Sequence, residues 1–353
     1  MSKKSESMIA KVLKASKLKN VAKLNQSILL EPYEQTVTHV PAINIALSGK
    51  IDGGIHYGFQ QIAGPSKHFK SSFGLIMISS YLKQHDDAIC LFYDGEFGTN
   101  MTYFENFGID LDRVFHIPFM NIEELKFDIM AQLNELNRDD KVIIFIDSIG
   151  NAASKKEVDD TLAEKSTADM SRAKQLASLG RMITPLLGTK RIPCIAINHT
   201  YKTQDLFSKD VVSGGTKILY SSNTVWIVGR EKVKEGGFIF NIKIEKSRFL
   251  EEGQKIPISV CDRGIGQWTG LDQMALEFGI VTSCKGPRNK NAIKYESKEH
   301  GPIIVTEDVV DFEEGEKLWT AVLKETNFKQ MIEDKYTLRW SGTSQQSEMV
   351  EED

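Results

Sequence analysis

The stretch Gly64-Pro65-Ser66-Lys67-His68-Phe69-Lys70-Ser71 lies between a predicted strand at 59–63 and a predicted helix at 71–83. It matches the phosphate-loop pattern G-x-x-x-x-G-K-[ST], except that Phe69 replaces the second glycine. Such a loop curls backbone N–H groups toward a phosphate, its lysine reaches the outer phosphate oxygens, and its hydroxyl binds Mg²⁺. Lys70 and Ser71 supply these two groups, and the loop amides can form the cradle if position 69 does not need a positive φ. A strand-to-helix turn with a chance lysine is the alternative interpretation of this motif.

From about residue 58, strands and helices alternate along the chain. The run Val142-Ile143-Ile144-Phe145-Ile146 is typical of a parallel strand covered on both faces. Alternation of this kind predicts a doubly wound, mostly parallel α/β sheet. Three later strands have no helices between them, which predicts an antiparallel extension. The expected strands lie at 88–93, 113–117, 141–147, 192–198, 224–228, 238–245 and 256–260, and the expected helices at 102–107, 122–136 and 169–187.

Polar residues follow the carboxyl ends of these strands. Glu96 comes just after the strand at 88–93, Asp147 closes the strand at 141–147, and His199 follows the strand at 192–198. In open α/β sheets, ligands bind at this edge, so these side chains should converge on one crevice. Each also has a structural interpretation, since an aspartate can cap the next segment and a histidine can be satisfied within a fold. Together with the phosphate loop they predict ATP hydrolysis, with Glu96 as general base, Asp147 holding Mg²⁺ and His199 at the γ-phosphate.

Two polar loops are candidates for binding a polyanion. Residues 200–217 mix lysines, aromatics and a Gly-Gly pair, which suits a single-stranded nucleic acid, although a flexible catalytic lid has a similar composition. Residues 154–166 lead into a helix bearing Arg172, which extends a basic lining or is simply a solvated face. The candidate DNA-binding residues are Lys155, Lys156, Arg172, Tyr201, Lys202, Phe207, Lys209, Gly214, Gly215 and Lys217.

Composition limits the class of protein. The chain has 353 residues, 41% of them hydrophobic and 26% charged, as expected for a globular protein without a membrane span. Its four cysteines form no C-x-x-C pair, which argues against a zinc cage or disulfide framework and favours a reducing cytoplasm. The net charge of −4 provides no global attraction to nucleic acid, so any polyanion site must be a local patch.

The two ends of the chain differ from the centre. Residues 8–24 carry an apolar stripe that predicts a helix, and this helix needs another surface to pack on. Residues 271–340 are expected to form a small C-terminal α/β domain that starts with a helix at 271–278 and ends in one at 316–333. Residues 341–353 are acidic and expected to be disordered.

In combination, these motifs resemble the RecA recombinase family, and within it most closely the UvsX group of T-even-type phages. The resemblance runs in order from about residue 40 to 280. It is carried by INIALSGKIDGG (43–54), AGPSKHFKSSFGL (63–75), CLFYDGEFG (90–98), FIDSIGNAASKKE (145–157), IPCIAINHTY (192–201), GGT (214–216) and IEKSR (244–248).

The resemblance implies further residue roles. Tyr103 matches the position that stacks on adenine, with Asn100 nearby, and His199 stands where bacterial RecA has a glutamine linking γ-phosphate to the DNA loop. Lys246 and Arg248 match two lysines that reach a neighbouring subunit's ATP, so both join Glu96, Lys70 and His199 as candidate catalytic residues. The implied ATP-binding residues are Gly64, Pro65, Ser66, Lys67, His68, Phe69, Lys70, Ser71, Ser72, Asn100 and Tyr103, with Ser71 and Asp147 at Mg²⁺.

The resemblance also implies an architecture and a function. It predicts a docking helix at 1–30, a RecA-like ATPase core at 31–270 whose DNA loops lie at 154–166 and 200–217, and the small C-terminal domain. Such a protein would form ATP-bridged helical filaments on single-stranded DNA and exchange strands with homologous duplex, serving phage recombination, repair and recombination-dependent replication. Expected partners are a phage single-strand-binding protein and a mediator, in the cytoplasm of the infected bacterium and not on a membrane. The alternatives are a ring helicase and a non-catalytic, ATP-binding filament mediator.

Overall fold

The structure is a computed structural model that describes residues 3–18, 20–164, 171–203, 209–233 and 237–338. The chain divides into two compact units, residues 1–35 and 36–353. The expected acidic tail at 341–353 lies outside the described residues. Within the described ranges, none of the helices has both the length and the apolar character needed to cross a membrane.

The first unit holds helix α1 (Lys3–Ala15), followed by short 3₁₀ turns at Leu24–Gln26 and Ile28–Leu30. The helix expected over 8–24 is therefore wrong beyond Ala15. The Ser16 hydroxyl accepts a hydrogen bond from the Leu18 amide at 3.2 Å, and Asn20 has a φ of +64°, so the local hydrogen bonds and backbone no longer follow the helix.

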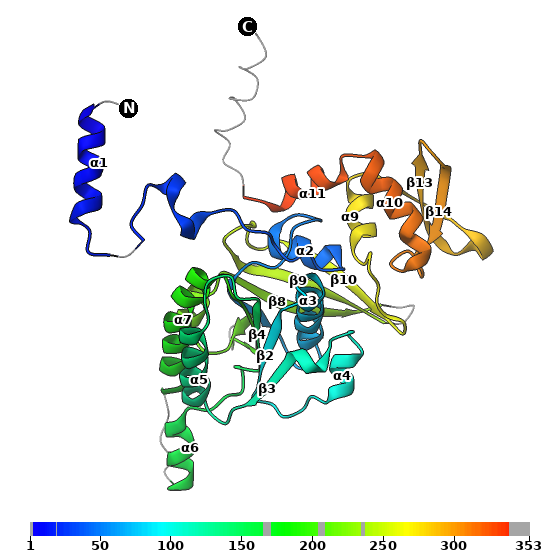
Figure 1. Cartoon of the computed structure of the whole chain (residues 1–353). Helices are drawn as coiled ribbons and strands as arrows, with labels where there is room; N and C mark the ends of the chain where they lie inside the picture. Colours follow the sequence, from blue (N-terminus) through cyan, green and yellow to red (C-terminus); the bar gives the residue numbers. More distant parts are fainter. Residues whose placement is uncertain (1–2, 19, 165–170, 204–208, 234–236, 339–353) are drawn as a thin grey trace. The chain divides into compact units, whose positions relative to one another are not determined.

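The second unit is built on a large sheet with strand order β11-β10-β9-β8-β1-β5-β4-β2-β3 (Figure 1). The strands from β8 to β3 in this order are mutually parallel, whereas β9, β10 and β11 add antiparallel pairs. The mostly parallel sheet with an antiparallel extension is confirmed. The strands are β1 (Gly58–Ala63), β2 (Ile89–Asp94), β3 (Val114–Pro118), β4 (Val142–Asp147), β5 (Pro193–Asn198), β8 (Thr224–Lys232), β9 (Phe238–Ser247), β10 (Lys255–Cys261) and β11 (Gly264–Ile265).

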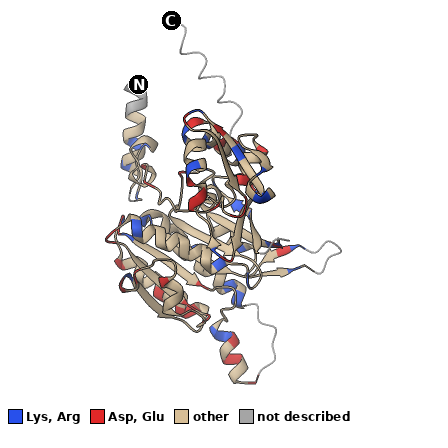
Figure 2. Cartoon of the chain, turned by 90° about the vertical axis from the view of Figure 1, so that its right-hand side faces the viewer, with Lys and Arg blue, Asp and Glu red and all other residues tan. Residues whose placement is uncertain are grey.

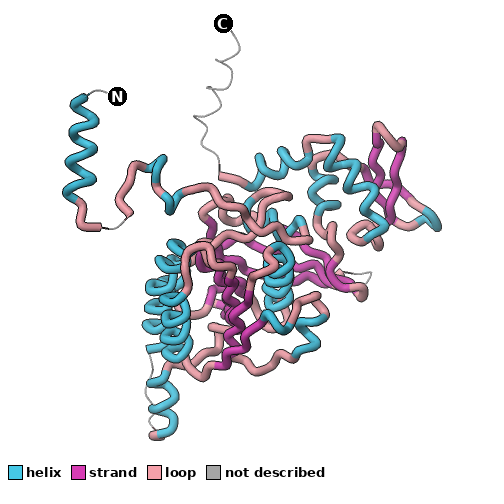
Figure 3. Tube along the Cα trace, viewed as in Figure 1, coloured by secondary structure: helices cyan, strands magenta, loops and turns pink. Residues whose placement is uncertain are grey.

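Helices cover both faces of this sheet (Figures 1 and 3). On one face, buried side chains such as Ile129 and Leu179 pack on Ile144 and Ala196. On the other face, Phe73 belongs to a cluster with Ile143, Phe145 and Ile197. The doubly covered sheet therefore has a large hydrophobic core on each face. The helices of this region are α2 (Pro41–Ser48), α3 (Lys70–Gln84), α4 (Met101–Glu105), α5 (Ile122–Glu135), α6 (Lys155–Leu162), α7 (Ser171–Lys190) and α8 (Thr216–Ser221).

The C-terminal region packs on the core through buried residues such as Trp319 and Phe328, which belong to the same cluster as Phe73. The single helix expected at 316–333 is wrong, because the Thr326 hydroxyl accepts the Phe328 amide at 3.1 Å and Thr326 itself is extended. The region contains α9 (Leu271–Glu277), α10 (Glu316–Glu325), α11 (Phe328–Tyr336) and a three-stranded sheet of β12 (Thr282–Lys285), β13 (Asn291–Ser297) and β14 (Gly301–Thr306).

Charged residues of both signs are interspersed over the described chain (Figure 2). This distribution agrees with the small net charge of −4. Electrostatic attraction to a polyanion must therefore come from particular side chains and not from a field of the whole molecule.

Candidate active site

The phosphate loop connects β1 to the N-terminus of α3. Gly64 has a φ of +158°, and a Cβ on it would come within 2.9 Å of the Val228 carbonyl oxygen. Lys70 is the first residue of α3 and donates through Nζ to the Pro65 carbonyl at 2.8 Å. Burial lowers the pKa of the Lys70 ammonium, although the carboxylates of Asp147 and Glu96 act in the opposite direction. The lysine is thus held over the loop, facing two carboxylates.

Phe69 has a φ of +56°, so the position does need a left-handed backbone. From the sequence, phenylalanine is compatible with a phosphate cradle if position 69 does not need a positive φ. The structure does not meet this condition. A non-glycine residue in this conformation costs about 1–2 kcal/mol, because its Cβ crowds the following carbonyl. The Phe69 carbonyl nevertheless accepts the first helical hydrogen bond of α3 from the Phe73 amide at 3.0 Å. Position 69 thus has a backbone conformation that favours glycine, although the residue there is phenylalanine.

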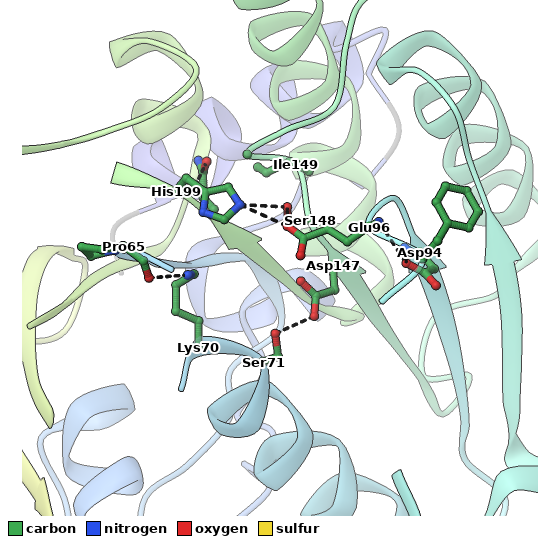
Figure 4. Close-up of polar contacts among 12 residues, drawn as sticks. Pro65, Lys70, Ser71, Asp94, Glu96, Asp147, Ser148, Ile149 and His199 are labelled. Carbon is green, nitrogen blue, oxygen red and sulfur yellow. Dashed lines mark hydrogen bonds and ion pairs between the residues drawn. The ribbon is translucent and has the colours of Figure 1, made fainter. Parts of the chain in front are cut away.

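Ser71 and Asp147 meet at the ends of α3 and β4 (Figure 4). The Ser71 hydroxyl donates to the Asp147 carboxylate at 2.6 Å. Burial raises the pKa of Asp147 to about 6, and the nearby Glu96 carboxylate adds to the rise. A buried carboxylate beside a second one is costly unless a positive charge is near. These two oxygen donors fit Mg²⁺, which prefers carboxylate and hydroxyl oxygens.

Glu96, Ser148 and His199 form a second polar cluster beside this pair (Figure 4). The Ser148 hydroxyl donates to the Glu96 carboxylate at 2.5 Å, and His199 Nε2 lies 3.1 Å from the same carboxylate oxygen. The His199 hydrogen bond, aided by Ser148, lowers the pKa of Glu96 to about 2. The Asp94 carboxylate accepts the backbone amides of Glu96 at 3.0 Å and Phe97 at 2.8 Å, which fixes the turn that carries Glu96.

Two adjoining cavities surround these groups. One, of about 410 Å³, is lined by residues 66–72 together with Glu96, Asp147 and His199, among others. The other, of about 480 Å³, extends past Ser71 to Asn100 and Tyr103. The Tyr103 hydroxyl bonds the Ser72 hydroxyl at 2.7 Å, and the Asn100 side chain caps α4 by accepting the Tyr103 amide at 2.9 Å. The sequence-predicted phosphate, metal and base positions are therefore brought together.

The segment 154–166, expected to be a loop, begins with helix α6 instead. Ser154 accepts the Glu157 amide at 3.1 Å while the Glu157 carboxylate accepts the Ser154 amide, a reciprocal capping box. The expectation of a loop followed from the polar composition and overlooked this signal. Lys155 and Lys156 are exposed on α6, and Lys156 lies 3.8 Å from Asp160.

The segment 200–217 forms a hairpin of β6 (Thr200–Lys202) and β7 (Asp210–Val212), and Lys217 belongs to α8 instead of the loop. Tyr201, Lys202 and Lys209 are exposed, whereas Phe207 lies outside the described residues. Gly214 and Gly215 have φ values of +96° and +81° and lead into α8.

The base of this hairpin is tied to the end of β5 at Asn198 and to the following residue, His199. The Ser213 amide donates to the His199 carbonyl at 2.8 Å. The Asn198 side-chain amide donates to the Ser213 carbonyl at 3.0 Å and to the Gln61 side chain at 2.8 Å. The backbone at His199 and the side chain of Asn198 are therefore both hydrogen-bonded to the hairpin's base.

Arg172 is half-buried, and its guanidinium bonds to groups of its own chain. Its guanidinium donates to the Ala152 carbonyl at 2.9 Å and the Ile149 carbonyl at 3.2 Å, contacts the Gly150 carbonyl and lies 3.3 Å from the Ser213 hydroxyl. Burial lowers the pKa of this group. Within the described residues it serves as an internal tie between 149–152 and the hairpin base.

The two candidate interface cations differ in their surroundings. Lys246 Nζ donates to the carbonyls of Leu219 at 2.8 Å, Tyr220 at 2.9 Å and Ser222 at 2.7 Å, so it binds the C-terminal end of α8. Arg248 is exposed. The structure thus gives Lys246 a contact within its own chain that sequence reasoning missed.

A phosphate loop at a helix N-terminus, with carboxylates at neighbouring strand ends, defines a P-loop nucleotide-binding α/β protein. Residues 6–252 match the RecA N-terminal domain family. The chain is 43% identical over 350 residues to a protein of Enterobacteria phage T4 named "Recombination and repair protein", covering 97% of this chain and 88% of that protein. The chain belongs to the RecA family.

Proposed function

We propose that this chain is a DNA-dependent ATPase of recombination, which assembles on single-stranded DNA and exchanges strands with homologous duplex. The observation that carries the proposal is the single cleft in which Lys70, Ser71, Glu96, Asp147 and His199 converge, with the 200–213 hairpin starting directly after His199. Membership of the RecA family and the name of the T4 relative support the proposal that the chain uses ATP turnover in recombination.

In the proposed reaction, Lys70 binds the outer phosphate oxygens of ATP, for which it leaves the Pro65 carbonyl. Glu96 is ionised and orients the attacking water as general base. Its low pKa of about 2 makes it a weak base while His199 and Ser148 bond to it. When His199 turns toward the γ-phosphate, Glu96 loses a hydrogen-bond donor and becomes more basic. The same motion thus senses ATP and prepares the base.

Ser71 and Asp147 would hold Mg²⁺. When bound, this ion neutralises charge on the phosphates and orients the leaving group. Tyr103 provides a ring at the mouth of the second cavity on which adenine stacks, and Asn100 fixes the start of its helix.

DNA affinity and ATP state are coupled through the hairpin base. Because Ser213 bonds both Asn198 and His199, ordering of residues 200–213 on DNA restricts His199, and the reverse also holds. Tyr201, Lys202 and Lys209 are exposed for stacking and phosphate contact.

Filament assembly brings Lys246 and Arg248 of one subunit to the ATP of its neighbour, for which Lys246 leaves the carbonyls at the end of α8. Head-to-tail contacts that do not close into a ring produce an open helix. The first unit, with its exposed Met8, Val12 and Leu13 on α1, is the segment that docks on the neighbour. A single-strand-binding protein and a mediator of the phage are the proposed helpers, in the cytoplasm of the host.

The test is strand exchange between single-stranded circles and homologous or unrelated linear duplex, with ATP and Mg²⁺. Joint molecules only with the homologous duplex are expected. Unwinding of duplex regardless of homology would indicate a helicase instead, and DNA binding without ATP turnover or exchange would indicate a filament mediator.

A further inference from the structure

We propose that Phe69 and Phe240 are positioning residues of the ATP site. The Phe240 ring braces the phosphate loop from β9 and keeps it in its nucleotide-binding conformation although position 69 is not glycine. The inference rests on the proposed function, since it concerns the same pocket.

Phe240 is fully buried in β9 and lies at the centre of an aromatic cluster. Its ring centroid is 4.9 Å from that of Phe69, 6.4 Å from that of His68 and 6.3 Å from that of Phe73. Aromatic pairs attract at these distances in tilted and edge-to-face arrangements. One ring of the sheet thus contacts both the end of the phosphate loop and the first turn of α3.

This contact explains how a strained residue is retained. The left-handed backbone at Phe69 is unfavourable for any side chain with a Cβ, so the surroundings must hold it. Phe69 itself is 38% exposed, and its ring packs on that of the buried Phe240. A smaller side chain would keep the strain and lose the brace.

Arg230 acts on the same loop from the neighbouring strand. It pairs with Phe240 across β8 and β9, lies 4.7 Å from the Phe238 ring centroid, and donates to the Lys67 carbonyl at 3.2 Å. In a trans peptide the C=O and N–H point in opposite directions, so this bond turns the His68 amide away from Arg230. A phosphate cradle is formed by loop amides that point toward the ligand, so the orientation of this peptide bears on the cradle.

The alternative is that Phe69 only fills a surface gap, in which case its loss would change stability but not nucleotide affinity. The variant Phe69→Ala separates these cases, because it retains the Cβ and removes the ring. Phe69→Tyr preserves the ring. Phe312→Ala is the matched control, since Phe312 is also partly buried and stacks on an arginine, Arg263, at 4.0 Å outside the pocket.

The experiment measures binding of a fluorescent ATP analogue with Mg²⁺ to the full chain without DNA, then KM and kcat with single-stranded DNA. We expect Phe69→Ala to raise Kd and KM about three- to tenfold with kcat within about twofold, whereas Phe69→Tyr and Phe312→Ala bind like wild type. Phe240→Leu should give a similar rise, and the double variant no more than the larger single effect, because both remove one contact.

Wild-type affinity in Phe69→Ala, or a fall in kcat without a change in Kd, would overturn the inference and leave the proposed function intact. A wild-type chain that binds no ATP would overturn both.

Discussion

The ATP pocket and the hairpin at 200–213 lie next to each other, yet they are built differently. In the pocket, the functional side chains already form hydrogen bonds within their own chain: Lys70 with Pro65, Ser71 with Asp147, and Glu96 with Ser148. In the hairpin, Tyr201 and Lys202 extend into solvent from a two-stranded ribbon. Under the proposed function, the difference means that the ATP site is organised before its ligand arrives, whereas the hairpin becomes organised when it binds DNA and neighbouring subunits.

Lys70→Ala tests the organised side of this comparison most severely. Removal of the ammonium leaves the phosphate charge unpaired in the pocket, so we expect ATP hydrolysis to fall by about a hundredfold or more. Steady-state turnover with single-stranded DNA is the measurement. The matched variant Lys83→Ala, on an exposed side chain in the last turn of the same helix, should retain most activity. Equal losses in both would contradict the assignment of Lys70.

Asp147→Asn tests whether the pocket sacrifices stability for function. The pKa of Asp147 is raised from 3.8 to about 6, so its stabilising contribution is present below about pH 4 and is lost as the pH rises through 6. We expect the ligand-free variant to exceed wild type in unfolding free energy by roughly 2–3 kcal/mol at pH 7. Urea titrations at several pH values measure this, and ATP hydrolysis should be lost. An advantage of the variant that does not grow between pH 4 and pH 6 would be inconsistent with a carboxylate whose pKa is raised by burial.

Arg172→Ala tests whether Arg172 stabilises the fold or belongs to the DNA-binding surface. Since Arg172 satisfies backbone carbonyls at Ile149 and Ala152, its loss should destabilise the chain by about 1–3 kcal/mol. Chemical denaturation is the readout, with exposed Arg248→Ala as the control, for which unfolding should be unchanged. Full stability combined with weakened DNA binding would show that Arg172 belongs to the DNA surface instead.

Lys202→Ala should give the smallest effect of these variants. In contrast to Arg172→Ala, it should change DNA binding and leave the free energy of unfolding almost unchanged. Its side chain is exposed, so unfolding should stay within about 0.5 kcal/mol of wild type. If Lys202 neutralises one phosphate, the salt slope of single-stranded DNA binding should decrease by about 0.7. Fluorescence anisotropy over a range of salt concentrations measures this, and an unchanged slope would remove Lys202 from the interface.

The sequence predicts the organised region better than the other, for a physical reason. Strand β4 is an unbroken apolar run ending in Asp147, and parallel strands place their carboxyl ends at one edge, so convergence follows from topology. Ser148 was missed because its role depends on the distance to Glu96 and His199, which no local pattern encodes. Phe240 was missed for the same reason, as only tertiary packing brings it to Phe69.

The region around the loops was predicted less well, since composition alone does not determine where a charge lies. Arg172 and Lys202 are equivalent cations in sequence, but one is bonded internally and the other is exposed. Helix α6 could have been found from Ser154 and Glu157, whose spacing is that of a capping box. The polar content of the segment outweighed this signal in the prediction.

The most direct test of the account is ATP hydrolysis by the full chain with and without single-stranded DNA, beside the variant Glu96→Gln. We predict that DNA stimulates the wild type strongly, and that the variant binds ATP but loses about 10²-fold or more of the stimulated rate, as expected for a general base. Hydrolysis that DNA does not change, or stimulation that survives in Glu96→Gln, would contradict the proposal that this cleft couples ATP turnover to DNA.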